Sequence, residues 1–394
     1  MIYRFGAFTL DAERMELRRD GERVPVEPQV FSLLLLLIEN RDRVVSKDEI
    51  IDAVWEGRAI SDATLSTRIN AARKAVDDTG KDQNVIRTAA RRGFRFVAEV
   101  GETPAGAGIT TPAAAPPEQD IRFCTAPDGA RIAYACVGDG PPLVKTANWL
   151  NHLEFDWESP VWKHMFRELA AGHKLIRYDS RGNGLSDWDV DDISFEALVG
   201  DLETVMDIAA PEKVDLFGIS QGCAVAVAYA VRHPDRVKRL VLHGGYAAGW
   251  EVSGTPEVKE RQRALLSLIK TGWGTDNPTF RQMFTSFFIP EGTPEHVQWF
   301  NELQRRTTSP ENALRLREMF SRIDVRPLLE KVTAPTLVLH CRDDAVVPFD
   351  KGRRIAAGIP GAHFVPLEGH DHLILEHDPA WPRFLAEVRA FLAA

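Results

Sequence analysis

The first hundred residues alternate short strand-like stretches with amphipathic helical patterns. Alternation of apolar and polar side chains with a period of two predicts strands, and apolar side chains three or four residues apart predict helices. The expected elements are strands at 3–10 and 15–18, helices that begin at Pro28, at Ser46 and at Ser61 or Asp62, and a hairpin of 85–88 with 94–97. We therefore expect a small α+β domain over residues 1–100.

From about residue 120 the pattern becomes an alternation of short apolar runs with longer amphipathic stretches. This order predicts an α/β domain, over residues 120–394, that is built on a mostly parallel sheet. The expected strands are 121–125, 131–137, 143–146, 174–178, 214–217, 239–243, 336–340 and 364–366, and the expected helices lie near 160–171, 195–209 and 222–232. Residues 246–326 form an insertion with helical patterns and many aromatic side chains, which predicts a helical cap over a pocket.

Composition separates the two parts. Fifteen of the nineteen residues at 101–119 are Gly, Ala, Pro or Thr, so we expect a flexible linker there. The chain shows no signal-peptide pattern, and its leucine-rich apolar run at 31–38 is too short to span a bilayer. The four cysteines have neither disulfide-rich nor zinc-binding spacing, so we expect reduced thiols, no metal, no cofactor and a cytoplasmic location.

Charge is distributed unevenly along the chain. The net charge is −9, yet residues 1–100 hold 17 basic and 17 acidic side chains, so the whole deficit lies in the second part. Within the first part, residues 61–97 carry eight basic against four acidic side chains. A small domain with one basic face has the charge pattern required to bind phosphate groups.

Four segments of the first part are distinctive: Phe5-Gly6-x-Phe8-x-Leu10-Asp11, Val44-Val45-Ser46-Lys47-x-Glu49-Ile50, Val54-Trp55 and Arg92-Gly93-Phe94-Arg95-Phe96. On these segments, residues 3–98 resemble the winged-helix DNA-binding domain of OmpR/PhoB-type response regulators. The resemblance implies that the third helix enters the major groove of DNA and that the last hairpin is the wing. Arg91 stands where the family usually has a wing-tip glycine.

The open face of the third helix carries short polar and basic side chains, which suit groove binding. We expect base contacts from Arg68, Asn70 and Lys74, phosphate contacts from Thr64, Thr67, Arg73 and Thr88, and backbone or minor-groove contacts from Arg91 and Arg92. The alternative is that these side chains form an ordinary solvated helix face.

Gly218-Ile219-Ser220-Gln221-Gly222 is a G-x-S-x-G sequence between a buried strand-like run and an Ala/Val-rich helical segment. This context predicts a nucleophile elbow, in which Ser220 occupies a strained turn and its hydroxyl stands clear of the backbone. The flanking glycines would leave no Cβ in the crowded turn. The alternative is an ordinary serine in a glycine-rich turn.

A second motif, Asp179-Ser-Arg181-Gly182-Asn-Gly184-Leu-Ser186, precedes the elbow. With the elbow and this motif, which matches the family's D-x-R-G-x-G-x-S loop, residues 120–393 resemble the α/β-hydrolase fold. The resemblance implies a serine, acid, histidine order of catalytic residues, which assigns Ser220, Asp344 and His372. Asp343 and His370 are the alternatives for the acid and the base.

In this assignment His372 takes the proton of Ser220, and Asp344 orients the ring and stabilises the imidazolium. The developing oxyanion needs two N–H donors. One is expected from Gln221 and the other, by position, from Trp149, because Thr146-Ala147-Asn148-Trp149 replaces the usual His-Gly.

These patterns favour a cytoplasmic transcriptional regulator that binds double-stranded DNA and receives its signal through residues 120–394 rather than through a receiver domain. We expect a homodimer whose α/β-hydrolase domain binds and hydrolyses a small apolar ester or lactone-like ligand. One alternative is a serine hydrolase, an esterase or lactonase, with an accessory winged helix. A second is a domain that binds ligand without hydrolysing it.

Overall fold

The computed structural model describes residues 2–12, 15–19, 22–24, 26–55, 62–89, 92–98, 100–103, 119–275 and 277–394. The chain divides into two compact units, residues 1–114 and 115–394, each with its own hydrophobic core. The two units are described separately below.

The first unit contains a five-stranded antiparallel sheet in the order β4-β3-β2-β1-β7. Its strands are β1 (Ile2–Phe5), β2 (Phe8–Asp11), β3 (Glu16–Arg19), β4 (Glu22–Val24) and β7 (Gly101–Thr103). The single strand expected at 3–10 is two strands, because Gly6 turns the chain with a φ of +53°. Strand β4 was not expected from the sequence.

Strand β7 corrects the expected boundary of the linker at residue 101. Residues 101–103 pair antiparallel with β1, from Ile2 opposite Thr103 to Arg4 opposite Gly101, so their backbone groups are satisfied within the first sheet. At the other end, Gln119 accepts a hydrogen bond from Arg177 and donates one to the carbonyl of Leu153, so it belongs to the second unit. The expected linker residues 104–118 lie outside the described residues.

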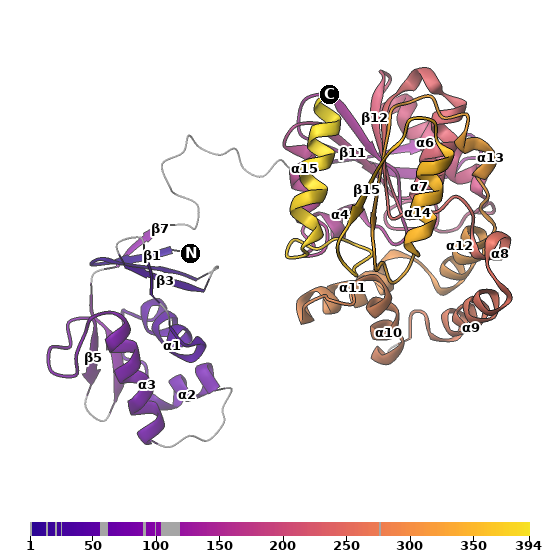
Figure 1. Cartoon of the computed structure of the whole chain (residues 1–394). Coiled ribbons are helices and arrows are strands. Elements are labelled where there is room, and N and C mark those ends of the chain that lie inside the picture. Colours follow the sequence, from indigo (N-terminus) through magenta and orange to yellow (C-terminus); the bar gives the residue numbers. More distant parts are fainter. Residues whose placement is uncertain are drawn as a thin grey trace. The chain divides into compact units, whose positions relative to one another are not determined.

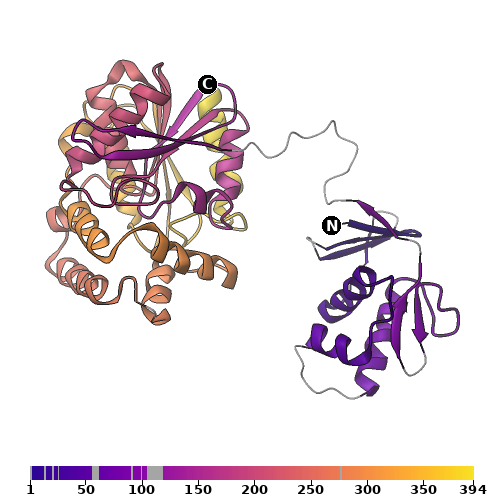
Figure 2. The same ribbon diagram turned by 180° about the vertical axis from the view of Figure 1, so that it is seen from behind.

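Three helices and a hairpin complete the first unit: α1 (Pro28–Glu39), α2 (Lys47–Trp55), α3 (Asp62–Ala75), β5 (Ile86–Ala89) and β6 (Gly93–Phe96). Figures 1 and 2 show the five-stranded sheet at one end of these helices and the β5–β6 hairpin to one side. The Ser46 hydroxyl accepts from the N–H of Glu49, and the Glu49 carboxylate accepts from the N–H of Ser46, so the predicted capping box is present. The expected α+β winged helix is confirmed.

The second unit is built on an eight-stranded sheet in the order β15-β14-β13-β12-β10-β11-β9-β8. The strands are β8 (Asp120–Thr125), β9 (Arg131–Val137), β10 (Pro142–Lys145), β11 (Lys174–Tyr178), β12 (Val214–Ile219), β13 (Val237–His243), β14 (Thr336–Cys341) and β15 (His363–Leu367). Strands β10 to β15 pair in parallel, whereas β8 and β9 are antiparallel at one edge. The mostly parallel sheet predicted from the alternating pattern is confirmed.

Helices cover both faces of this sheet, and Figure 1 shows α15 on one side and α6 and α7 on the other. The helices outside the cap are α4 (Leu153–Trp157), α5 (Lys163–Ala170), α6 (Phe195–Ala209), α7 (Gly222–Arg232), α14 (Phe349–Gly358) and α15 (Ala380–Ala393), with a short 3-10 turn η1 (Pro234–Arg236). Helices α5 and α15 share a face, because the rings of His164 and Trp381 meet at 4.5 Å.

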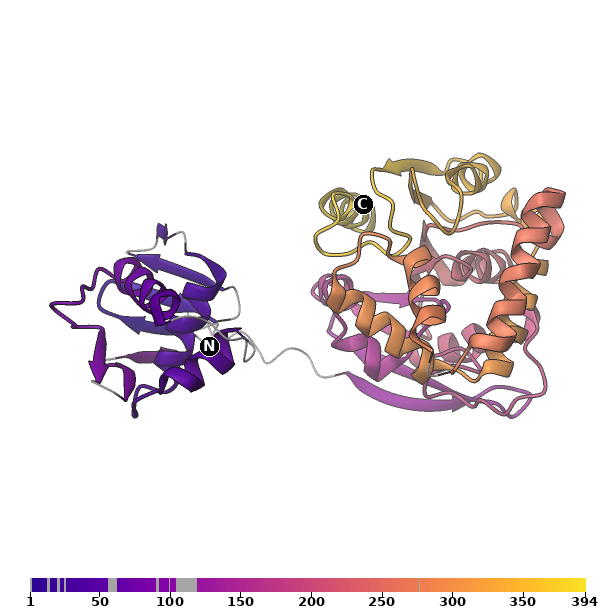
Figure 3. The ribbon, with the colours of Figure 1, turned by 90° about the horizontal axis from the view of Figure 1, so that it is seen from below.

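The expected cap is present as a group of helices at one end of the sheet. It consists of α8 (Trp250–Ser253), α9 (Pro256–Gly272), α10 (Pro278–Phe288), α11 (Pro294–Thr307) and α12 (Pro310–Arg322), whereas the short helix α13 (Arg326–Leu329) that follows packs on α7 and α14. Figure 3 shows these helices in orange tones across that end of the domain. Among the described residues, no helix is long and apolar enough to cross a membrane.

Candidate active site and DNA-binding face

Ser220 occupies a sharp turn between β12 and α7. Its φ is +55°, a left-handed conformation that is rare for residues other than glycine and that costs backbone strain. A Cβ on Gly218 would lie 2.8 Å from the Cα of Cys223, and one on Gly222 would lie 2.6 Å from the Thr146 hydroxyl. The turn therefore has the tight geometry that the G-x-S-x-G sequence predicted.

Asp344 and His372 form a buried pair. The Nδ1 of His372 lies 2.7 Å from Oδ2 of Asp344, and the other carboxylate oxygen accepts from the N–H groups of Val346 and Val347, both at 2.8 Å. Burial by itself would raise the pKa of Asp344, but the neighbouring His372 and His340 and these hydrogen bonds outweigh it and lower the pKa. Asp344 is thus held as a carboxylate that fixes the tautomer of His372.

The elbow and the Asp–His pair meet at the turn after β13. The N–H of Ser220 donates to the carbonyl of His243 at 3.0 Å. A Cβ on Gly245 would lie 3.3 Å from the carbonyl oxygen of Ser220, and a Cβ on Gly244 would lie 3.3 Å from Cε1 of His372. The backbone of Ser220 and the ring of His372 therefore each lie next to one of two consecutive glycines. The Nε2 of His372, buried without a hydrogen-bond partner, is the nitrogen left for a serine hydroxyl.

The two alternative residues lie elsewhere. Asp343 is exposed. The side chain of His370 is 57% exposed, and its Nε2 is 3.8 Å from Glu291. Neither side chain joins the buried pair, so the geometry favours Asp344 and His372.

The loop after β10, where the second oxyanion donor was expected, is attached to the elbow. Thr146 donates from its N–H to the carbonyl of Phe217 at 2.9 Å and from its hydroxyl to the carbonyl of Gly222 at 3.1 Å. Trp149 follows on this loop and is buried. The N–H groups of Gln221 and Trp149 stay a prediction as the oxyanion donors.

Aromatic side chains of the cap cover this region. The ring of Trp149 stacks on Trp273 at 5.4 Å and meets the edges of Phe284 at 5.5 Å and Phe320 at 6.1 Å. The carbonyl of Phe288, at the end of α10, accepts from the N–H of His372 at 2.9 Å. The cap is therefore bonded directly to the loop that carries the candidate base.

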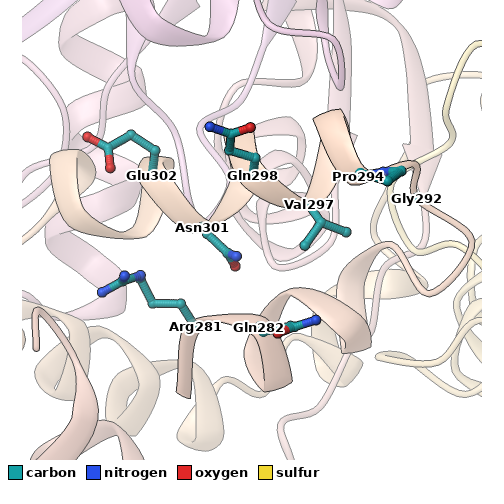
Figure 4. A pocket seen from close by; sticks show the side chains of 8 residues that line it. All are labelled: Arg281, Gln282, Gly292, Pro294, Val297, Gln298, Asn301 and Glu302. Carbon is teal, nitrogen blue, oxygen red and sulfur yellow. The ribbon is translucent and has the colours of Figure 1, made fainter. Parts of the chain in front are cut away.

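A polar groove lies between α10 and α11 (Figure 4), with a volume of about 630 Å³. Its lining includes Arg281 of α10 and Gln298, Asn301 and Glu302 of α11. None of the three candidate catalytic residues lines this groove. Its polar lining and its position on the cap distinguish it from the aromatic region around Trp149.

The D-x-R-G-x-G-x-S loop has a structural role. Oδ2 of Asp179 accepts from the N–H groups of Leu185 and Leu153, and a Cβ on Gly184 would lie 2.1 Å from the same oxygen. The buried guanidinium of Arg181 pairs with Asp201 at 2.6 Å. The loop is fixed by buried charges that hydrogen bond one another.

The expected DNA-binding side chains divide into exposed and buried groups. Leu65, Ile69, Ala72 and Val76 form the predicted buried stripe of α3. Those exposed on α3 and the hairpin are Thr64, Thr67, Asn70, Lys74, Thr88 and Arg92. Arg68 is partly exposed and paired with Glu27, and Arg91 lies outside the described residues.

The structure corrects the phosphate contact that was expected from Arg73. Its side chain is buried, and its guanidinium donates to the carbonyl of Ile86 at 2.8 and 3.2 Å and to the hydroxyl of Thr88 at 2.9 Å. These bonds join α3 to β5, so Arg73 serves the fold of the domain. The reason is its position in the helix, next to Ala72 and one turn after Ile69, at the edge of the buried stripe.

Two histidines next to the site were not predicted. His243 ends β13, neither ring nitrogen has a hydrogen-bond partner, and burial lowers its pKa to about 3, so it is neutral. His340 lies 3.6 Å from Oδ2 of Asp344, and its Nε2 bonds to the carbonyl of Val347 at 2.8 Å. His243 is the last residue of β13 and His340 the last but one of β14, at the edge of the parallel sheet that carries the elbow. A histidine at this end of a buried strand was a usable sequence signal.

Comparison with known proteins assigns both parts of the chain. Residues 156–379 match the model of the alpha/beta hydrolase fold family, and residues 21–96 match the family described as "Transcriptional regulatory protein, C terminal". The first match covers more than half of the chain.

Several relatives of the second unit are named as hydrolases. The AB hydrolase superfamily protein YisY of Bacillus subtilis is 29% identical over 60% of this chain and 86% of its own length. A 2-hydroxy-6-oxononadienedioate/2-hydroxy-6-oxononatrienedioate hydrolase of Cupriavidus pinatubonensis is 30% identical over 66% of this chain and 86% of its own. These likenesses support a hydrolase.

Solved structures of esterases are similar to the second unit. The esterase RhEst1 from Rhodococcus sp. is 26% identical, with a TM-score of 0.57 over 70% of this chain and 98% of its own. The esterase EaEST from Exiguobacterium antarcticum, at 24% identity, has a TM-score of 0.60 over 69% of this chain and 99% of its own, and shows the fold. The chain belongs to the alpha/beta hydrolase fold family and carries, ahead of that domain, a winged helix of the OmpR/PhoB type.

Proposed function

We propose that this chain is a DNA-binding transcriptional regulator whose hydrolase domain binds and hydrolyses a small apolar ester or lactone-like ligand. The observation that carries the chemistry is the 2.7 Å contact between His372 and Asp344, with the opposite nitrogen of His372 unpartnered. The strained turn at Ser220 lies next to Gly245, and His372 lies next to the adjacent Gly244, which supports the assignment of the nucleophile.

In the proposed reaction, Ser220 Oγ attacks the ester carbonyl carbon while Nε2 of His372 takes its proton. The oxyanion is stabilised by the N–H groups of Gln221 and Trp149. His372 then gives the proton to the leaving alkoxide, and an acyl-serine remains. A water molecule, deprotonated by His372, attacks the acyl-serine and releases the acid.

The regulatory part of the proposal is supported by the winged helix and by the exposed polar face of α3. Asn70 and Lys74 point away from the buried stripe, as base-reading side chains must. We propose that ligand binding or acylation at Ser220 alters the affinity of the winged helix for double-stranded DNA.

We also propose a homodimer, because winged-helix regulators use paired half-sites on DNA. Light scattering of the full chain at micromolar concentration should give twice the monomer mass. A monomer at that concentration contradicts the homodimer.

An active-site phosphonate tests the chemistry. It should form a covalent adduct with the wild-type chain and none with Ser220→Ala, detected by mass spectrometry of the intact protein. Equal labelling of both proteins, or labelling of neither, would contradict the assignment of Ser220.

A further inference from the structure

Arg317, on the inner side of α12, is a cap arginine placed against the candidate oxyanion loop. Its guanidinium carbon lies 5.2 Å from the centre of the Trp149 ring. Tyr246 follows the two glycines that lie next to Ser220 and His372. Tyr246 is close enough to Arg317 for their electrostatic interaction to raise the pKa of Arg317, against the effect of burial. Arg317 therefore faces the region of the nucleophile from the cap.

Arg317 has few protein partners for its charge. Nη2 is 3.4 Å from Oε1 of Gln262, a long hydrogen bond, and Nε is buried without any partner. Within the described ranges no carboxylate lies at ion-pair distance from it. Burial lowers the pKa of Arg317, since removing a guanidinium from water without an anion is unfavourable.

The other cap arginines differ. Arg305 and Arg306 are exposed and pair with Glu302, at 3.9 and 2.9 Å. Arg315 donates to the carbonyls of Val190 and Asp191, at 2.9 and 2.6 Å. Arg317 thus combines partial burial, with a fully buried Nε, closeness to Trp149 and a missing counter-charge.

We infer that Arg317 binds a carboxylate of the ligand, so that the substrate is an ester or lactone whose apolar body carries an acidic group. This inference rests on the proposed function and narrows its substrate class. The aromatic side chains around Trp149 suit the apolar body, and the planar guanidinium presents two parallel N–H groups to a carboxylate.

The test compares para-nitrophenyl half-esters of dicarboxylic acids, from succinate to suberate, with the monoacid esters of equal carbon number. For at least one chain length the wild-type chain should prefer the acidic ester. Arg317→Met should lower kcat/KM for that ester about tenfold to a hundredfold, mainly through KM, because a hydrogen-bonded charge pair is lost. The neutral ester should be nearly unaffected, and Arg317→Lys should keep part of the preference.

Arg305→Met, an exposed arginine of the same cap, is the matched control and should change neither rate. Binding of the same esters to Ser220→Ala, with and without Arg317→Met, is measured by calorimetry. If the acidic esters bind in a way that depends on Arg317 but the wild-type chain does not hydrolyse them, the proposed hydrolysis is contradicted and the inference is supported. A preference for the neutral ester at every chain length would overturn the inference alone. An equal loss of kcat/KM for the acidic and the neutral ester in Arg317→Met would do the same.

Discussion

At the scale of single residues, the chemistry depends on how the fold prepares His372. Its Nδ1 is engaged by Asp344, so Nε2 keeps the lone pair that a general base needs. The neighbouring histidines, His243 and His340, are buried, and burial lowers the pKa of both rings. Asp344 is held as a carboxylate, because its contacts with His372 and His340 lower its pKa.

Asp371, next to the candidate base, gives a pH-dependent prediction. It is 1% exposed, and Oδ2 has no hydrogen-bond partner. Burial raises its pKa from 3.8 to about 6, helped by nearby Asp378 and Glu291. The folded chain therefore holds this proton more tightly than the unfolded chain, and that stabilisation is lost as the pH rises from about 4 through about 6.

Asp371→Asn should accordingly stabilise the hydrolase domain above pH 6, by up to about 3 kcal/mol, and should have little effect near pH 4. The amide oxygen can still accept the N–H of Glu291, which lies 3.0 Å from Oδ1 in the wild type. Urea unfolding followed by tryptophan fluorescence measures this, since eight of the nine tryptophans lie in the second unit. A stabilisation that does not change with pH would contradict the prediction.

The sequence could predict only those residues of the candidate site that belong to a short motif or to a fixed order along the chain. Ser220, Asp344 and His372 follow from the elbow and the family's chain order. Arg317 could not be found this way, because its closeness to Trp149 depends on how the cap folds back. Arg73 was misassigned because a basic residue at the edge of a helical stripe can point inward or outward.

At the scale of elements, the elbow is held by close backbone approach. A Cβ on Gly222 would lie 2.7 Å from the carbonyl oxygen of Ala147 and 2.6 Å from the Thr146 hydroxyl. Gly222→Ala should therefore displace the candidate oxyanion loop and lower kcat/KM for an activated ester about a hundredfold, as displacements near 1 Å do.

Gly200→Ala is the control for this change. Gly200 lies inside α6, and a Cβ there would meet nothing within 4 Å, so the variant should keep full activity and gain about 0.5–1 kcal/mol of stability. Equal activity of the Gly222→Ala and Gly200→Ala variants would show that the elbow tolerates a side chain.

Helix α3 offers two adjacent basic residues with opposite expected roles. Arg73→Met removes the hydrogen bonds to Ile86 and should destabilise the first unit by about 1–3 kcal/mol. Lys74→Met, on the exposed face, should leave stability within about 0.5 kcal/mol and weaken DNA binding. Hydrogen exchange of residues 62–98 in the full chain separates the two, and equal protection in both variants would refute the distinction.

Most elements were predictable because their apolar periods are long and regular, as in β11 and α6, whose bounds match the expected ones. The failures have local causes. The turn at Gly6 divides the run, and the buried positions shift there from Tyr3 and Phe5 to Phe8 and Leu10, while β4 is only three residues long. Strand β7 lacks an apolar pattern, because its pairing with β1 depends on the backbone.

At the scale of the whole molecule, two units with separate cores combine a candidate ester-hydrolysing site and a winged helix in one chain. With a net charge of −9, the chain as a whole repels DNA, so binding must come from the basic part of the first unit. The affinity for duplex DNA should therefore fall steeply with salt, and titration at several salt concentrations measures the slope. A flat dependence would argue against phosphate contacts.

The most direct test of the whole account is the affinity of the full chain for DNA before and after a phosphonate occupies Ser220. Duplexes selected from a random pool by the unmodified chain serve as the probe, and fluorescence anisotropy gives Kd. We expect modification to change Kd of the wild-type chain at least about fivefold, the lower range of allosteric coupling, with no change for Ser220→Ala. An unchanged Kd at complete labelling of Ser220 would contradict the coupling of hydrolase site and DNA-binding domain.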